Sequence, residues 1–184
     1  MKIAFVQDII QFSVPLGTTL IAGTLRKAGH KVEVYVAENN IKKTVQELQE
    51  YKPDIVAFSV ITGSHLEYIE IAKILKQELN IPILWGGPHV TFFPKIIEQD
   101  YADAVCVGEG EDAALEFANA FDNSSGKMPT NIKNFWVKVG GKIYRNPVRS
   151  RIRNLDNVAY AARDLYFNKF PVLKNHGIKH FLAH

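Results

Sequence analysis

Short runs of β-branched and other apolar residues alternate with helically spaced apolar residues over the first 125 positions, and this alternation constrains the fold most. Five runs of four to six residues have this character: Ile3–Val6, Val32–Val36, Ile55–Val60, Ile81–Trp85 and Ala104–Val107. Continuous runs of this length are typical of parallel strands that are covered on both faces. Because parallel neighbours are joined by right-handed helical crossovers, the pattern predicts an α/β fold with a doubly wound, five-stranded parallel sheet.

Helices are expected between the runs. Three apolar stripes have helical spacing: Leu20, Ile21, Thr24, Leu25 and Ala28; Ile41, Val45 and Leu48; Tyr68, Ile71, Ala72, Leu75 and Leu79. A further helix is expected over Gly110–Phe121. Gly29 suits a C-terminal cap, and Ser64 with Glu67 matches a capping box. The predicted strand order is 2-1-3-4-5, as in flavodoxin-like folds, where ligands bind above the C-terminal ends of strands 1 and 3.

The chain divides into three predicted parts. These are residues 1–125, the sheet unit; residues 126–150, a β-hairpin extension; and residues 151–184, an irregular connector. The hairpin is expected because Phe135–Val139 and Lys142–Tyr144 flank a Gly140-Gly141 turn. The connector keeps many apolar residues but has no apolar period, so it is expected to pack against a further domain.

Composition excludes several classes of protein. The chain is 47% hydrophobic and 22% charged, and none of its apolar runs approaches the roughly 20 residues that cross a bilayer. No membrane partner is therefore expected, and the predicted location is the cytoplasm. The single cysteine, Cys106, cannot form a disulfide framework or a cysteine metal cluster within the chain, and it is expected to be a small buried residue.

Charge does not favour nucleic acid as a partner. The net charge is only +3, which is too weak to indicate a nucleic-acid surface. Five basic residues nevertheless crowd one late segment: Lys142, Arg145, Arg149, Arg151 and Arg153. This cluster is interpreted as a solvated linker face or as a contact with the further domain.

Common nucleotide and phosphate motifs are missing. The turn after the first run holds one glycine, Gly17, where a dinucleotide fingerprint needs three. Gly108-Glu109-Gly110 lies among carboxylates that would repel a pyrophosphate, and there is no P-loop. The third run ends in Phe58-Ser59-Val60 without the aspartate of a phosphoacceptor receiver domain.

Small residues instead follow three of the predicted strands. The third strand leaves through Ser59–Ser64, the fourth through Gly86–His89 and the fifth through Gly108–Glu111. Glycines at neighbouring strand ends remove Cβ atoms and let a bulky group approach the backbone, although tight strand–helix turns would need them too.

The spacing of these residues resembles that of cobalamin-binding domains. Such domains carry Asp-x-His-x-x-Gly, then Ser-x-Leu, then Gly-Gly at characteristic separations. Here 41 positions (18–58) separate Gly17 from Ser59, and 26 positions (60–85) separate Ser59 from Gly86-Gly87. The first motif then falls on residues 12–17, where Phe12 replaces the aspartate and Val14 replaces the histidine that ligates cobalt.

Without that histidine, the chain resembles the N-terminal domain of cobalamin-dependent radical S-adenosylmethionine enzymes. Four segments in order carry this resemblance: Pro15-Leu16-Gly17, Phe58-Ser59-Val60, Trp85-Gly86-Gly87-Pro88-His89 and Gly108-Glu109-Gly110-Glu111. Residues 154–156 and 163–166 are similar to the family's connector. Residues 181–184 are similar to the first strand of the catalytic barrel that follows it.

The resemblance implies cobalamin as the cofactor of this chain, with S-adenosylmethionine and a 4Fe-4S cluster in the full-length enzyme. The cluster needs three cysteine thiolates, so the 184-residue chain alone is not expected to be catalytically competent, and no catalytic or metal-ligating residue is assigned in it. The full enzyme would be a methyltransferase or a cyclase. Cobalamin would be held with its dimethylbenzimidazole base detached from cobalt, and Val14 would leave the metal without a protein ligand below.

Sixteen residues are implied to contact the cofactor. They are Val14, Leu16, Gly17, Ser59, Val60, Ile61, Thr62, Gly63, Ser64, Gly86, Gly87, Pro88, His89, Gly108, Glu109 and Gly110. Ser59 would hydrogen-bond the base, and Gly86-Gly87 would make room for it. His89 would line the same pocket, whereas His65 is expected at the surface. Glu109 would favour the positive end of the following helix.

Two other readings stay open at this point. One is a stand-alone corrinoid carrier or sensor with no enzymatic partner in the chain. The other is a flavodoxin-like module that binds a different nucleotide or only another protein. An apolar terminal segment favours the enzyme over the carrier, and visible colour after exposure to a corrinoid would separate both from the third.

Overall fold

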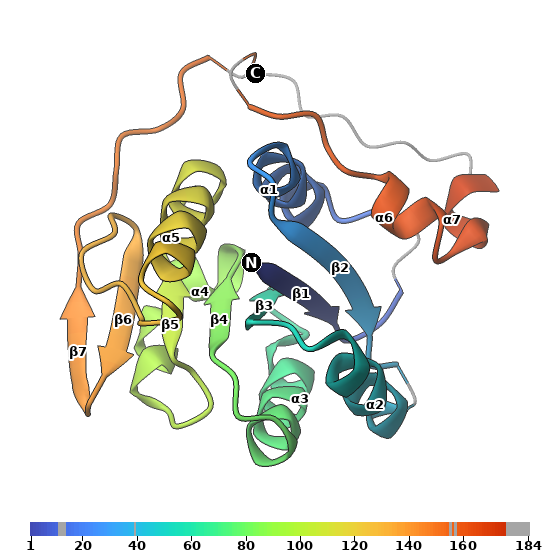
Figure 1. Ribbon diagram of the computed structural model, residues 1–184, viewed down its shortest axis with the longest axis horizontal. Coiled ribbons are helices and arrows are strands. Elements are labelled where there is room, and N and C mark those ends of the chain that lie inside the picture. Colours follow the sequence, from blue (N-terminus) through green and yellow to red (C-terminus); the bar gives the residue numbers. More distant parts are fainter. Residues whose placement is uncertain (11–13, 39, 155, 157, 176–184) are drawn as a thin grey trace.

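The computed structural model describes residues 1–10, 14–38, 40–154, 156 and 158–175, and it contains one seven-stranded sheet (Figure 1). The strand order is β2-β1-β3-β4-β5-β6-β7. The strands are β1 (Lys2–Gln7), β2 (Lys31–Val36), β3 (Ile55–Ser59), β4 (Ile83–Gly86), β5 (Ala104–Cys106), β6 (Phe135–Val139) and β7 (Lys142–Arg145). The first five are parallel in the predicted order 2-1-3-4-5, which confirms the fold class.

The predicted hairpin forms and also extends the sheet. Strand β6 pairs antiparallel with β5, Ala104 lying opposite Val137, and β7 pairs with β6 in turn. The edge of β5 is therefore covered by backbone of the same chain, which protects it from pairing with other molecules. Sequence periodicity predicted the hairpin but not where it would pair.

Helices cover both faces of the sheet, as Figure 1 shows. Helices α1 (Leu16–Lys27) and α5 (Glu111–Asn123) lie on one face, and α2 (Ile41–Tyr51) and α3 (His65–Glu78) lie on the other. Helix α1 ends in the predicted glycine cap: Gly29 has φ +93, and the next residue, His30, donates its N–H to the carbonyl of Leu25. The predicted capping box at Ser64 is wrong, because its side chain makes no capping bond to the start of α3.

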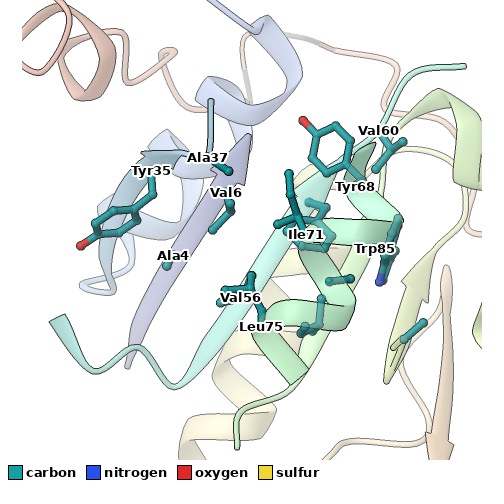
Figure 2. Packing of buried hydrophobic residues seen from close by; sticks show 14 of the residues in the cluster. Ala4, Val6, Tyr35, Ala37, Val56, Val60, Tyr68, Ile71, Leu75 and Trp85 are labelled. Carbon is teal, nitrogen blue, oxygen red and sulfur yellow. The ribbon is translucent and has the colours of Figure 1, made fainter. Parts of the chain in front are cut away.

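The face under α2 and α3 is densely filled (Figure 2). Trp85 and Tyr68 pack edge-on against Phe58, with ring centroids 4.9 and 5.3 Å apart from it. Val56 and Leu75 are fully buried beside them. This face therefore contains the main hydrophobic core.

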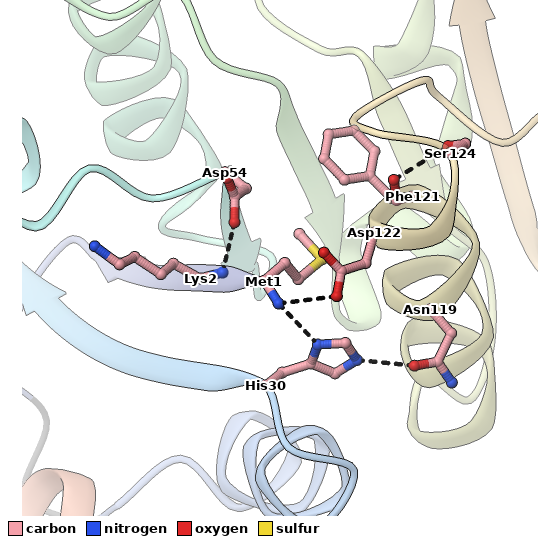
Figure 3. A network of polar contacts seen from close by, with 8 residues as sticks. All are labelled: Met1, Lys2, His30, Asp54, Asn119, Phe121, Asp122 and Ser124. Atoms are coloured by element: carbon pink, nitrogen blue, oxygen red, sulfur yellow. Dashed lines mark hydrogen bonds and ion pairs between the residues drawn. The ribbon is translucent and has the colours of Figure 1, made fainter.

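The other face is held together at the N-terminal end of the sheet by a polar network (Figure 3). The amino group of Met1 donates to the Asp122 carboxylate (3.1 Å) and to Nδ1 of His30 (3.3 Å). Nε2 of His30 bonds Oδ1 of Asn119 at 3.0 Å. Because His30 follows α1 while Asn119 and Asp122 belong to α5, these bonds fix the two helices to each other at one end.

Two short helices that the sequence did not indicate follow β4. They are α4 (Pro88–Phe92) and a 3₁₀ turn, η1 (Pro94–Glu98). Each begins with a proline, whose fixed φ suits the first position of a helix. Both helices are too short to show an apolar period in the sequence.

After β7 the chain crosses the outer side of α5 and α1 (Figure 1). The Arg149 guanidinium pairs with Glu116 of α5 at 2.6 Å, and the Ile152 N–H donates to the Glu109 carboxylate at 2.7 Å. The chain then meets α1 at Gly23, where a Cβ would overlap the carbonyl oxygen of Tyr160. Arg149 thus binds the domain itself rather than forming part of a solvated linker face.

The connector also forms two short helices, α6 (Asp164–Phe167) and α7 (Pro171–Asn175), on the sheet unit. Tyr166 and Leu173 are buried in the cluster that contains Phe5 and Leu25. The prediction that this segment packs against a further domain is therefore wrong for these two residues. Residues 155 and 181–184, which were part of the resemblance, lie outside the described residues.

Among the described helices, none has both the length and the hydropathy needed to cross a membrane.

Candidate functional site

The centre of the sheet is incompletely covered on the face of α1 and α5. In β3 and β4, residues that point to the α2 and α3 side are buried, whereas those on the opposite side are only half-buried, except Ile55 at the start of β3. The half-buried residues are Ala57, Ser59, Leu84 and Gly86. Central strands of a doubly wound sheet are normally buried on both faces, so this alternation indicates space above them.

That space is an apolar cavity of about 70 Å³ between the sheet and the two helices. It is several times the roughly 10–15 Å³ that one water molecule needs on this measure, and empty apolar cavities of this kind stay dry. Its lining residues are Ile3, Phe5, Ile21, Leu25, Ile55, Ala57, Phe58, Leu84, Trp85, Gly86, Cys106, Gly110, Ala114, Phe117, Ala118 and Phe135.

Small side chains create this space. Gly86 lies opposite Ser59 in the sheet register, and a Cβ on Gly86 would have only ordinary contacts, 3.6 Å to the Phe58 carbonyl and 3.8 Å to the Cβ of Cys106. Across the cavity lie Gly110, the residue that precedes α5, and Ala114 of α5. Two of the predicted site residues, Gly86 and Gly110, therefore line one cavity, and Ser59 lies beside it at the C-terminal edge of β3.

Cys106 lines the same cavity as a neutral thiol. Burial, with the charge of Glu111 as a smaller cause, raises the pKa of this thiol to about 12. The group is thus protonated at neutral pH and acts as a small apolar side chain, as the sequence predicted.

Gly87 has a different role from its neighbour. Its φ is +92, and a Cβ would lie 2.6 Å from the backbone nitrogen and 2.7 Å from the carbonyl oxygen of Val60. The Val60 N–H donates to the Gly86 carbonyl and the His89 N–H donates to the Val60 carbonyl. The backbone segments that follow β3 and β4 therefore lie in close contact here. The prediction that Gly87 makes room for a ligand is wrong, because the backbone of Val60 fills that place.

The loop after β3 is joined to α4 through a pair of histidines. Thr62 Oγ1 lies 3.1 Å from Nδ1 of His89, and the His89 ring stacks on His65 at 4.3 Å between centroids. Burial, and to a smaller extent His65, lower the pKa of His89. His65 was predicted at the surface, which is wrong, because it is half-buried against His89 and its Nδ1 has no hydrogen-bond partner.

Most other predicted residues near this loop face away from the cavity. The Val60 side chain is fully buried in the core under α3, so only its backbone is available at the sheet edge. Ile61, Thr62 and Gly63 are exposed above that edge. Ser64 begins α3, and Pro88 begins α4.

The loop between β5 and α5 holds the connector. The Gly108 N–H donates to Thr91 Oγ1 at 3.1 Å. The backbone carbonyl of Glu109 accepts from the Asn134 side chain, and the Glu109 carboxylate accepts from Ile152. Glu109 therefore holds the connector, and the structure gives it no side-chain bond at the start of α5.

The loop between β1 and α1 is described only in part. Val14 is half-buried and packs against the cluster containing Phe5, and Leu16 lies in a groove between α1 and the connector. A Cβ on Gly17 would meet no atom within 4 Å. Phe12, at the aspartate position of the resembled motif, lies outside the described residues.

Sequence reasoning missed the helix side of the cavity. Ile21 of α1 and Ala114 and Phe117 of α5 close the cavity on the side opposite the sheet. In the sequence, each of them looks like an ordinary member of an apolar helix stripe. Ala57 gave a weak signal, because it interrupts a run of larger residues at the centre of a strand. A small residue at such a position removes bulk where the sheet is most deeply covered.

Comparisons with known proteins show the family of the chain. A family model described as the B12 binding domain matches residues 6–118. An uncharacterized methyltransferase from Pyrococcus horikoshii is 31% identical over 157 residues, which is 82% of this chain and 34% of that protein. The anaerobic magnesium-protoporphyrin IX monomethyl ester cyclase of Cereibacter sphaeroides is 26% identical over 152 residues, or 78% of this chain and 25% of that protein.

Solved structures share the fold. The cobalamin-dependent S-adenosylmethionine radical enzyme OxsB, with aqua-cobalamin bound, superposes with a TM-score of 0.73 at 18% identity, over 93% of this chain and 25% of that one. The radical S-adenosylmethionine methyltransferase TsrM from Kitasatospora setae gives 0.64 at 19% identity, over 79% of this chain and 30% of that one. This chain thus spans between about a quarter and about a third of each of these proteins. With the family model matching more than half of its residues, the chain belongs to the B12-binding domain family.

Proposed function

We propose that this domain binds cobalamin with the dimethylbenzimidazole base, detached from cobalt, inside the cavity under α1 and α5. The observation that carries the proposal is the set of half-buried residues of β3 and β4 that lie beneath an apolar cavity. A flat aromatic base with apolar edges fits such a site, because apolar cavities favour apolar aromatic ligands.

The corrin ring would then lie on the C-terminal edge of the sheet. Ligands of doubly wound folds bind at this edge, near the point where successive helices leave to opposite faces. Ser59, half-buried at the end of β3, would hydrogen-bond the base, and the exposed Thr62 and Gly63 would contact the corrin amides. Val14 offers no donor atom to cobalt, so the lower face would have no ligand from this position.

We infer further that the domain serves a larger radical S-adenosylmethionine enzyme, in which methyl transfer is the favoured reaction. The support is its membership of the B12 family and its likeness to a methyltransferase and a cyclase of greater length. Cobalamin supplies a cobalt centre that accepts and donates methyl groups, while the protein holds and orients it. A role as a separate corrinoid carrier is the alternative.

The test is to load the protein with cobalamin, remove free cofactor by desalting, reduce cobalt to the divalent state and record its EPR spectrum. We expect retained cofactor and a spectrum without the nitrogen splitting that a coordinated base or imidazole produces. Free cobalamin at the same pH, which keeps its base on cobalt, is the control. Loss of the cofactor on desalting, or a nitrogen-split spectrum, would contradict the proposal.

A further inference from the structure

The cavity contains almost no group that can hydrogen-bond a ligand. Of the described lining residues, two have a side chain with a heteroatom. The Trp85 indole packs on the opposite face, in the core under α3, and donates its N–H to the Tyr101 carbonyl at 3.3 Å, whereas Cys106 carries a neutral thiol. No charged, amide or hydroxyl side chain of the described residues belongs to the lining. Ser59 lies outside it, at the sheet edge.

The backbone groups of the strands and helices that line the cavity are also largely hydrogen-bonded. Strands β1, β3, β4 and β5 are neighbours in the paired sheet, so their N–H and C=O groups bond one another. Helix α1 satisfies its backbone groups internally above the cavity, and α5 does so from Ala114 onward, whose N–H donates to the Gly110 carbonyl at 2.7 Å. The N–H groups that precede Ala114 lie at the start of α5, where a helix leaves its first donors without an intrahelical partner. Away from the start of α5, a ligand in the cavity therefore finds apolar contacts and no free donor or acceptor among the described residues.

From this lining we propose that the cavity selects corrinoids by their lower base, accepting dimethylbenzimidazole and discriminating against a purine. The inference rests on the proposed function, since it requires the base to enter the cavity. Beyond its imidazole part, dimethylbenzimidazole carries only a benzene ring and two methyl groups. Adenine carries an exocyclic amine and additional ring nitrogens, which would be stripped of water and left without partners.

The expected discrimination is large enough to measure. Burying one polar group without a partner weakens binding by roughly 10-fold or more. Adenine would bury several such groups, although its amine can keep some water near the mouth. We therefore expect the adenine-based corrinoid to bind at least about 10-fold more weakly than cobalamin.

The test compares three probes by titration of the apoprotein: cobalamin, pseudocobalamin with an adenine base, and cobinamide, which lacks the base entirely. Cobalamin tighter than pseudocobalamin, with cobinamide weak, supports the inference. Equal binding of cobalamin and pseudocobalamin, both tighter than cobinamide, would overturn the inference and leave the proposed function standing. Cobalamin binding no tighter than cobinamide would instead remove the proposed function.

A matched pair of variants identifies the lining as the cause. Ala114→Ser places a hydroxyl in the cavity and should narrow the ratio between cobalamin and pseudocobalamin, by about 3-fold or more if one polar group gains a partner. Ala120→Ser makes the same change on the same helix outside the lining and should leave the ratio unaltered. An unchanged ratio in Ala114→Ser, or an equal change in Ala120→Ser, would show that the discrimination arises elsewhere.

Discussion

Replacing Gly86 by leucine is expected to abolish retention of cobalamin while the domain stays folded. Gly86 has an ordinary backbone conformation, and the space beside it is the cavity itself. A leucine side chain would enter that space and exclude the base. An aromatic ring that buries about 150–200 Å² gains roughly 4–5 kcal/mol, so the affinity for cobalamin should fall by on the order of 1000-fold.

Two further measurements make this result specific. The melting temperature of the apoprotein should change little in Gly86→Leu, because the added side chain occupies empty apolar space. Gln77→Leu, on the exposed side of α3 at the opposite face of the sheet, adds the same side chain elsewhere and should bind cobalamin normally. Normal retention by Gly86→Leu would place the base outside the cavity.

Gly87→Ala is expected to lower the free energy of unfolding by about 3 kcal/mol. Gly87 has φ +92 and ψ 176, a region that essentially only glycine occupies, and a Cβ would lie 2.6 Å from backbone of Val60. Neither the strain nor this contact can be relieved without separating the ends of β3 and β4. The melting temperature should fall by roughly 6–12 °C for a chain of this size.

The adjacent glycine provides the control. Gly86→Ala adds the same methyl group where a Cβ has only ordinary contacts of 3.6 and 3.8 Å. Its unfolding free energy should therefore stay within about 1 kcal/mol of the original value. Equal stability of the two variants, measured by thermal or urea unfolding, would contradict the close backbone contact assigned to Gly87 and Val60.

The sheet unit was predictable because its signals are local. Each parallel strand is a short apolar run, and each main helix has its own stripe, so the order of elements could be inferred residue by residue. The Gly29 cap followed from the same logic and is confirmed. The capping box at Ser64 failed because sequence spacing permits that bond but does not require it.

What could not be predicted depends on contacts between distant segments. The pairing of β6 with β5 and the burial of Tyr166 in the cluster that contains Phe5 and Leu25 join residues far apart in sequence. The two adjacent glycines look alike in the sequence but have different roles. Gly86 lines the cavity, whereas Gly87 lets the backbone of Val60 approach closely. Only the three-dimensional register separates them.

The central claim is that the cofactor's base occupies the cavity between the sheet and helices α1 and α5. The most direct measurement is an NMR experiment on the diamagnetic cobalamin complex, with the alanine methyl groups of the protein labelled. The account predicts nuclear Overhauser contacts from the aromatic protons of the base to the methyl groups of Ala57 and Ala114, which line the cavity from opposite sides. A bound cofactor whose base shows no contact with either methyl group would contradict it.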